Sequence, residues 1–138
     1  MGSDLEELLG IAPPMLWLDE IVARGPRSVR CRLTPRAAHP FAEAGGVEPL
    51  TTLEWMGQAA AVLAALLARD AGDAPVARRL SAVSEARFAG EMLELGAELS
   101  IEAEQTDQDS FSCAVRRNDR VLATALLRLS EHPRGSTA

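Results

Sequence analysis

One long helical segment constrains the fold of this chain more than any other feature. The segment from Leu50 to about Asp70, LTTLEWMGQAAAVLAALLARD, has apolar and small residues at helical spacing, and Gly72 follows near its expected end. The residues expected to share one buried face are Leu50, Leu53, Gly57, Ala60, Ala61, Ala64 and Leu67. Because small residues fill much of this helix, another layer of structure could approach its backbone closely. The sequence therefore predicts a central helix wrapped by a sheet.

Short alternating runs on both sides of this helix predict the sheet. Two strands are expected before it, in MLWLDEIVARG and RSVRCRLTP, and four after it, in LSAVSEARF, AELSIEAEQ, SFSCAVRR and RVLATALLRLS. The turns between the later runs are marked by Gly90, Gly96, the TDQD segment from Thr106, and Asn118-Asp119. Such short connections favour antiparallel pairing. The order indicates an α+β fold, and the edge strand that such a sheet exposes favours a dimer.

The chain has the length and composition of one globular domain. It contains 138 residues, of which 47% are apolar and 25% charged, and no linker or repeat divides it. Residues 1–10 form an N-terminal extension with a short helical turn around Asp4 to Leu9. Pro35 to Pro49 is expected to be a loop, and residues 132–138 a flexible tail.

Charge and cysteine content exclude several classes of function. The net charge is −6 and there is no lysine, so the chain is not expected to bind nucleic acid. Cys31 and Cys113 are isolated, as in buried thiols of a reducing compartment. The N-terminus does not resemble a signal peptide, and the longest apolar run, Ala59 to Ala68, is about half of a membrane span. We therefore expect a cytoplasmic protein without a membrane span.

Glu54 is the candidate catalytic residue on the central helix. Thr51-Thr52-Leu53-Glu54 also fits a capping box, in which Glu54 would only close the helix N-terminus. Gln58 lies one turn after Glu54 on the same face, which places two polar groups near the apolar stripe. Since buried polar groups need partners, a polar pocket is the alternative interpretation of this pair.

His39 is the candidate base, and Gly45-Gly46 are candidate substrate-binding residues. A single histidine in a proline-containing loop is more often a surface residue than a catalyst. The two glycines, however, allow a positive φ and close approach to a ligand, shortly before a helix start with free N–H groups. Histidine, backbone donors and carboxylate together could remove a proton beside a carbonyl and expel a hydroxyl.

Three segments resemble the hotdog-fold 3-hydroxyacyl-[acyl-carrier-protein] dehydratases, especially the subgroup from aryl polyene-type clusters. PPMLWLDEIV is similar to the family's opening strand, Pro-x-Met-Leu-Leu-Leu-Asp. LEWMGQAAA resembles the helix signature Leu-Glu-x-Met-Ala-Gln-Ala, and ARFAGEMLELGAEL resembles the later Arg-Phe…Pro-Gly-Asp-x-Leu segment. Their order and spacing, more than any one of them, support the resemblance over most of the chain.

The resemblance implies a dimer with acyl-thioester tunnels at the subunit interface, and no metal or organic cofactor. In the family a histidine of one subunit removes the α-proton of a 3-hydroxyacyl thioester, and a carboxylate on the partner's central helix protonates the departing hydroxyl. Glu54 matches that acid and Gln58 matches the amide one turn on. Phe41 and Trp55, together with Leu53 and Met56, are candidates for the tunnel wall, although core packing explains them equally well.

The histidine position departs from the family motif Gly-His-Phe-Pro-Gly. Pro40 stands where the family has its histidine, and His39 lies one residue farther from Glu54. A one-residue insertion would bring His39 to the catalytic place. In the other alignment, which we favour, His39-Pro40-Phe41 matches a segment before a shortened catalytic loop and the base is missing. The chain would then be a non-catalytic or half-site subunit beside a complete partner.

The resemblance also implies the partners. These are an acyl carrier protein with a phosphopantetheine-linked acyl chain, and a second hotdog subunit in a homodimer or a heterodimer with a paralogue. The carrier is acidic, so docking would need basic residues on this acidic chain. The candidates are Arg78, Arg79, Arg87, Arg116, Arg117 and Arg120. A hotdog acyl thioesterase, with Glu54 activating water, is a further alternative.

Overall fold

A computed structural model describes residues 2–11, 15–39, 41–43, 45–74 and 78–131 of the chain. The helices are α1 (Gly2–Leu9), the short 3-10 helix η1 (Pro49–Thr51) and α2 (Thr52–Asp70). The strands are β1 (Glu20–Gly25), β2 (Ser28–Leu33), β3 (Ala42–Glu43), β4 (Gly46–Val47), β5 (Arg78–Phe88), β6 (Leu99–Asp107), β7 (Ser110–Arg117) and β8 (Arg120–Glu131).

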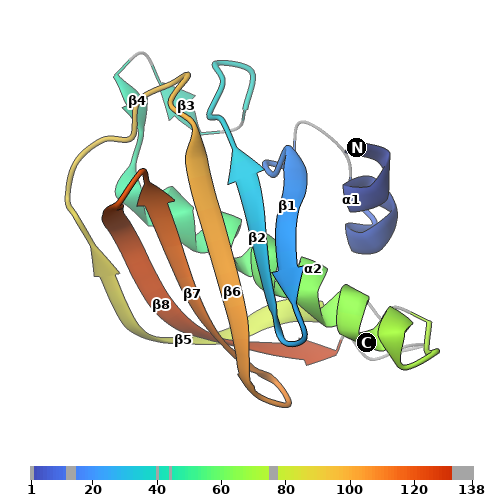
Figure 1. The fold of residues 1–138 in the computed structure, drawn as a ribbon. Helices are drawn as coiled ribbons and strands as arrows, with labels where there is room; N and C mark the ends of the chain where they lie inside the picture. The colour runs from blue at the N-terminus through green and yellow to red at the C-terminus, as the bar shows by residue number, and fades with distance from the viewer. Residues whose placement is uncertain (1, 12–14, 40, 44, 75–77, 132–138) are drawn as a thin grey trace, which may run out of the picture.

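The main sheet has six antiparallel strands in the order β1-β2-β6-β7-β8-β5, and α2 crosses behind it (Figure 1). Consecutive hairpins join β6, β7 and β8, whereas β5 returns from α2 to pair with β8 at the edge. Alternate residues of β2, β6, β7 and β8 are buried, which gives the sheet one face toward the helix. The expected α+β hotdog architecture, a sheet around one long helix, is therefore confirmed.

The first strand begins later than predicted. MLWLDEIVARG suggested a strand from Met15, but β1 starts at Glu20. The chain just before β1 does not continue the strand, because the Met15 carbonyl and the Trp17 backbone N–H both bind the side chain of Gln58. The predicted loop from Pro35 to Pro49 contains the two-residue strands β3 and β4, which pair with each other.

The start of α2 corrects the capping-box interpretation. Thr51 at the helix N-terminus has helical backbone angles and makes no side-chain capping bond. The Thr52 hydroxyl donates instead to the carbonyl of Pro49 at 2.6 Å, within the turn formed by η1. Since the threonine does not cap the helix, Glu54 has no reciprocal role to fill, and its side chain bonds Gln58.

The buried face of α2 is rotated from the predicted one. Ala60 and Ala64 are buried as predicted, but Leu50 is 63% exposed, and Leu53, Gly57 and Ala61 are only partly covered. The side chains that enter the core are Thr52, Trp55, Met56, Gln58, Ala59, Ala60, Val62, Leu63, Ala64, Ala65 and Leu66. Small residues occur all round this helix, so spacing alone did not distinguish its faces, and the bulky side chains decided the orientation.

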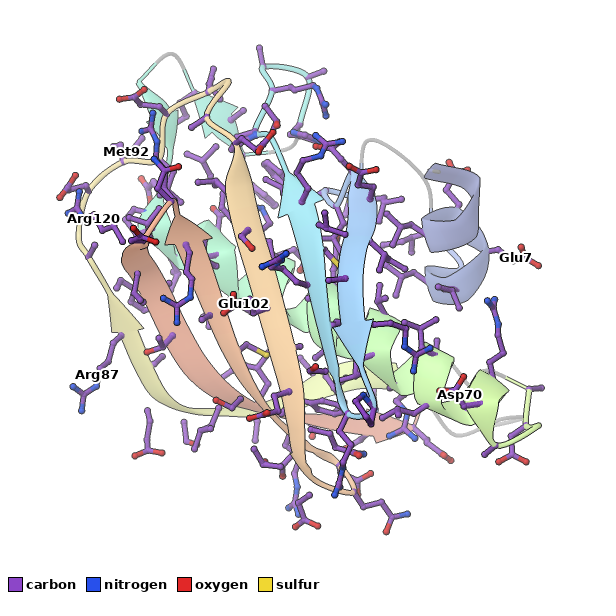
Figure 2. All side chains as sticks on the ribbon, viewed as in Figure 1. Glu7, Asp70, Arg87, Met92, Glu102 and Arg120 are labelled. Carbon is purple, nitrogen blue, oxygen red and sulfur yellow. The ribbon has the colours of Figure 1, made fainter. Side chains whose placement is uncertain are left out.

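The N-terminal helix belongs to the packed domain. Leu5 and Leu8 of α1 are buried in the common core, and α1 packs against α2 and β1. Figure 2 shows the opposite side of α1, where Glu7 points away from the protein. The predicted tail, residues 132–138, lies outside the described residues.

The central helix is also the one candidate membrane span among the described residues. Pro49–Asp70 is long and apolar enough by length and composition. Most of it is buried within the protein, however, as expected of a core helix covered by a sheet.

Candidate functional site

Gln58 is a buried polar side chain that connects three parts of the site. Its Nε2 donates to the carbonyl of Met15 at 2.8 Å and to Glu54 Oε2 at 3.2 Å, while its Oε1 accepts the Trp17 N–H at 2.9 Å. Gln58 is only 5% exposed, so these bonds replace the water that an amide would otherwise require. The amide therefore fixes the chain before β1 against α2 and orients the carboxylate of Glu54.

The carboxylate of Glu54 lies on the open side of α2. It lines a hollow of about 420 Å³ together with Phe41, Glu43, Glu48, Leu50 and Thr51. Those lining residues include three carboxylates and no basic side chain. Within one subunit, the space beside Glu54 is thus a shallow, exposed hollow rather than an enclosed slot.

Phe41 is held at this hollow in an unfavourable backbone conformation. Its φ is +66°, in the left-handed region that bulky residues rarely adopt, and its side chain is 68% exposed. Such strain persists only where the surrounding structure imposes it, and it is common at functional sites. An aromatic ring is therefore presented to the outside next to Glu54.

His39 is fixed by a reciprocal pair of bonds with Arg36. The Arg36 N–H donates to His39 Nδ1 at 3.0 Å, and the His39 N–H donates to the Arg36 carbonyl at 3.0 Å. Burial, and after it the positive charge of Arg36, lowers the pKa of His39, against the opposing charge of Asp19. Because Nδ1 accepts a hydrogen bond, the neutral ring carries its proton on Nε2. In this arrangement Nε2 is a donor and not a base.

Aromatic stacking links His39 to the core. The rings of His39 and Trp17 stack with centroids 4.1 Å apart and planes 26° apart. Trp17 in turn packs on Trp55 with centroids 5.3 Å apart. Together with the hydrogen bonds from the Trp17 backbone N–H to Gln58 and from Gln58 to Glu54, this contact connects His39 and Glu54 within one subunit.

Trp55 lies on the core side of α2. It is fully buried, and its indole N–H has no acceptor among the described residues. It does not line the hollow beside Glu54. Among the candidate wall residues, Phe41 therefore lies at the hollow, whereas Trp55 packs in the core.

The two candidate glycines differ in their surroundings. Gly46 has a φ of +115°, and a Cβ there would overlap the carbonyl oxygen of Leu93. Next to it, Val47 and Leu93 exchange two backbone hydrogen bonds of 2.8 Å. Gly46 thus allows the close approach of the chain's own backbone, while Gly45 faces open space.

The sequence matches the ApeP-like family, described as ApeP dehydratase, over residues 3–137. The chain belongs to the ApeP-like dehydratase family. No curated protein sequence matches it. The expected resemblance to hotdog dehydratases is therefore confirmed at the level of the family.

Solved structures show the same fold as this ApeP-like protein. The dehydratase heterocomplex ApeI:P from Xenorhabdus doucetiae aligns with a TM-score of 0.84 and 21% identity, covering 94% of this chain and 91% of that one. A hypothetical thioesterase with coenzyme A from Streptococcus pneumoniae aligns with a TM-score of 0.62 and 11% identity, covering 82% and 84%. PaaI from the phenylacetic acid degradation operon of E. coli aligns with a TM-score of 0.61 and 12% identity, covering 94% of this chain and 89% of that one. At these identities the likeness concerns the fold.

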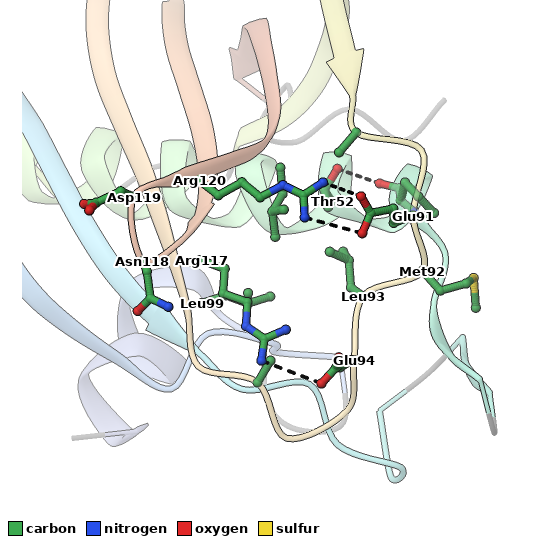
Figure 3. A pocket seen from close by; sticks show the side chains of 14 residues that line it. Thr52, Glu91, Met92, Leu93, Glu94, Leu99, Arg117, Asn118, Asp119 and Arg120 are labelled. Carbon is green, nitrogen blue, oxygen red and sulfur yellow. Dashed lines mark hydrogen bonds and ion pairs between the residues drawn. The ribbon is translucent and has the colours of Figure 1, made fainter.

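Most arginines predicted to bind an acidic carrier already pair with carboxylates of the ApeP-like chain. Arg116 bonds Glu102 at 3.0 Å, and Arg78 lies 3.4 Å from Asp109. Arg117–Glu94 and Arg120–Glu91 pairs lie at the rim of a second pocket of about 440 Å³ (Figure 3). No sequence pattern indicates this pocket, because the β5–β6 connection and the β7–β8 hairpin form it only in the folded sheet.

The cysteines do not contribute to the site. Both thiols are buried and free, and burial raises the pKa of each, Cys31 and Cys113, to about 12. Within the described ranges, no group of three or more histidine, cysteine or acidic side chains is arranged to hold a metal ion.

Proposed function

We propose that this ApeP-like protein is the acid-bearing subunit of a two-subunit hotdog dehydratase. Its substrates would be 3-hydroxyacyl thioesters on an acyl carrier protein in fatty acid, polyketide or aryl polyene-type biosynthesis in the cytoplasm. The observation that carries the proposal is Glu54 on the open side of α2, oriented by the buried amide of Gln58. The family match and the likeness to a dehydratase heterocomplex support it.

The chemistry needs one base and one acid. A base removes the proton from the α-carbon, the electron pair forms the double bond to the β-carbon, and the β-hydroxyl leaves as water after receiving a proton from the acid. Gln58 bonds Oε2 of Glu54, which leaves Oε1 to carry the proton toward the hydroxyl. Glu54 is accordingly the proposed acid.

The base is proposed to come from the other subunit. His39 could act as a base only if its Nδ1 gave up the Arg36 N–H and the ring proton moved from Nε2. The assignment that needs neither change is that the stacking of His39 on Trp17 stabilises the loop before β3. Removal of a proton by His39 of this chain is the alternative that the experiment below distinguishes.

A second subunit is proposed to complete the tunnel. Strand β5 lies at the sheet edge and is exposed along nearly its whole length, as a strand available for pairing would be. ApeI:P is a heterocomplex, which favours a paralogous hotdog subunit over a second copy of this chain.

The carrier is proposed to dock near β5. Arg79 and Arg87 are exposed on this strand, and no described residue forms an ion pair with either. Figure 2 shows Arg87 pointing away from the protein. Arginine suits the phosphate of phosphopantetheine and the acidic surface of a carrier. Charge reversal of both is expected to weaken carrier binding most at low salt, and unchanged affinity would remove this part of the proposal.

The test measures dehydration of a 3-hydroxyacyl carrier thioester by the purified protein, by its hotdog paralogue and by the mixture. Only the mixture is expected to be fully active, and Glu54→Gln is expected to reduce its rate of dehydration by roughly 10²–10⁴-fold. His39→Ala is expected to leave catalysis by the correctly folded mixture within about tenfold of wild type, since an acid–base residue contributes more than that. Activity of this protein alone that disappears in His39→Ala would establish His39 as the base. Release of free carrier thiol would indicate a thioesterase.

A further inference from the structure

The pocket between the β5–β6 connection and the β7–β8 hairpin is separate from the hollow next to Glu54. The two cavities share no lining residue. The apolar part of the pocket is formed by Leu93, Leu99 and Leu122, which belong to the core. Its volume of about 440 Å³ is at the lower end of the range, roughly 300–1,000 Å³, that is usual for small-molecule sites. This pocket is therefore a second candidate site.

Backbone hydrogen bonds hold the β5–β6 connection in place above the pocket. They tie it at three points to other parts of the chain. The pairs are Ala89 with Leu122 at 2.9 Å, Leu93 with Val47 at 2.8 Å, and Gly96 with Pro35 at 2.8 Å. Since the interior of a protein is normally packed without spaces of this size, a space that the backbone keeps open is informative. A pocket formed in advance binds a ligand without the cost of ordering a loop.

Two arginines of the β7–β8 hairpin extend across the mouth of the pocket to glutamates of the β5–β6 connection (Figure 3). Arg120 contacts both carboxylate oxygens of Glu91, and Arg117 lies 3.6 Å from Glu94. The Arg117 side chain is 45% exposed and the Glu94 side chain 72%, so the arginine is the more covered partner. Asp119, at the tip of the hairpin, points away from both pairs (Figure 3). A ligand that enters the pocket therefore meets two guanidinium groups above an apolar floor.

These ion pairs can be replaced by a ligand at low cost. Their side chains are exposed to solvent, and surface ion pairs of this kind contribute little to stability. A guanidinium binds a carboxylate through two parallel hydrogen bonds. Glu91 occupies this position on Arg120 and so shows where the carboxylate of a ligand would be held. The released glutamate would be hydrated at the surface.

We propose that this pocket binds a small carboxylic acid with a hydrocarbon chain. The carboxylate of the ligand takes the place of Glu91 on Arg120, with the guanidinium of Arg117 beside it, and its chain lies on the leucine floor. The pocket also reaches Thr52 at the start of α2, the helix that carries Glu54, so the ligand contacts the same helix as the proposed acid. The inference does not depend on the two-subunit function, because all of these residues belong to one subunit.

The first test uses octanoate as the probe and the purified full chain. Amide NMR is expected to show saturable binding with a dissociation constant below about 1 mM, with shifts concentrated in the β5–β6 connection and the β7–β8 hairpin. Octanol and octylamine are expected to bind at least tenfold more weakly, because neither offers two acceptor oxygens to a guanidinium. Equal binding of octanol would show a purely apolar cavity, and tighter binding of octylamine a cation site. Either result would overturn the inference, as would shifts located elsewhere.

The second test separates the arginines from the ion pairs that they make. Arg117→Gln with Arg120→Gln is expected to weaken octanoate binding at least tenfold, because the ligand loses both guanidinium groups. Glu91→Gln with Glu94→Gln breaks the same two ion pairs, but it is expected to strengthen binding at least twofold, because the competing carboxylates are gone. If both double variants weaken binding equally, the ion pairs only support the loop and the inference is wrong.

A control pair on β5 accounts for the change in net charge. Arg79→Gln with Arg87→Gln removes the same charge at exposed positions of that strand, outside the pocket. It is expected to change octanoate binding less than threefold at physiological salt, because distant exposed charges are screened. A loss as large as that of the pocket arginines would show that only the overall charge matters, which would also overturn the inference.

The third test fills the pocket. Ala97 is buried and lines it, so Ala97→Leu is expected to abolish octanoate binding while raising the melting temperature through added apolar contact. Undiminished binding by a stable Ala97→Leu variant would place the ligand elsewhere and contradict the proposal. If the larger side chain lowers the melting temperature instead, the comparison of the arginine and glutamate pairs decides.

Discussion

The amide of Gln58 holds Glu54 Oε2 at 3.2 Å while its carbonyl oxygen accepts the Trp17 N–H at 2.9 Å. One side chain thus supports the fold and the candidate site together. The residue that orients the Glu54 carboxylate also fixes the chain entering β1, so the direction of the carboxylate depends on correct packing of that segment.

Gln58→Leu is expected to destabilise the protein strongly. The substitution leaves the Trp17 N–H and the Met15 carbonyl buried without partners, and each lost partner costs about 1–3 kcal/mol. Chemical denaturation should therefore show a loss of roughly 2–6 kcal/mol in the free energy of unfolding. Gln105→Leu is the control, because Gln105 bonds exposed groups at the surface. An equal loss in both variants would contradict the role assigned to Gln58.

The stability of the protein is expected to fall in acid because of His39. The folded state lowers the pKa of this ring, so it binds the proton less well than the unfolded chain does, whose histidine pKa is about 6.5. The stabilisation is therefore present above about pH 6.5 and is lost as the pH falls through the lower folded pKa.

His39→Asn separates the hydrogen bond that the His39 ring accepts from the titration of the ring. The asparagine oxygen can accept the Arg36 N–H as Nδ1 does, but it does not titrate. The melting temperature of wild type should fall more than that of His39→Asn between pH 7.5 and pH 5, as measured by calorimetry. A pH dependence that is identical in the two proteins would show that His39 is not the responsible group.

Much of the fold, but less of the site, could be predicted from the sequence. Period-2 alternation located β7 and β8 almost to the residue, because a half-buried strand must alternate apolar and polar side chains. The buried face of α2 was predicted only in part, with Ala60 and Ala64 buried as expected and Leu50 exposed, since alanines lie all round the helix and do not distinguish core from surface. The late start of β1 was missed as well, because it depends on Gln58, a distant residue whose bond to Trp17 spans 41 positions.

The site residues show the same difference between features set by local sequence and features set by tertiary contacts. Glu54 and Gln58 were identified because positions one turn apart share a helix face, and the structure brings them together. The surroundings of His39 depend on Arg36 and Trp17, and no local pattern indicates that Nδ1 accepts a backbone N–H. Sequence patterns report local geometry, whereas the protonation state of a ring follows from tertiary contacts.

Both cysteines are expected to be unreactive in the native protein. Burial raises the pKa of Cys31 and Cys113 to about 12, so the thiolate fraction at pH 8 is on the order of 10⁻⁴. Ellman's reagent should label neither thiol until the protein unfolds, and should then label both. Rapid labelling of the folded protein would show that β2, which carries Cys31, or β7, which carries Cys113, opens to solvent. A Cys113→Ser variant would identify which one, because it leaves only Cys31 to react.

Gly46→Ala is expected to disrupt the connection beside the site. The backbone at Gly46 has a φ of +115°, which alanine rarely adopts, and the new methyl group would overlap the Leu93 carbonyl oxygen. Relief of that overlap would separate Val47 from Leu93 and break two backbone hydrogen bonds. Backbone strain and lost bonds together predict a decrease of about 2–4 kcal/mol in the free energy of unfolding.

Gly45→Ala is the matched control for this substitution. A Cβ at Gly45 meets no atom within 4 Å, and its φ is outside the left-handed region. Its free energy of unfolding should change by less than about 1 kcal/mol, or increase slightly because alanine restricts the unfolded chain. The hypothesis that both glycines bind substrate makes the opposite prediction, because both variants would then fold normally and bind the acyl thioester weakly. Denaturation of the two variants, followed by measurement of substrate binding, therefore decides whether Gly46 serves the fold or the ligand.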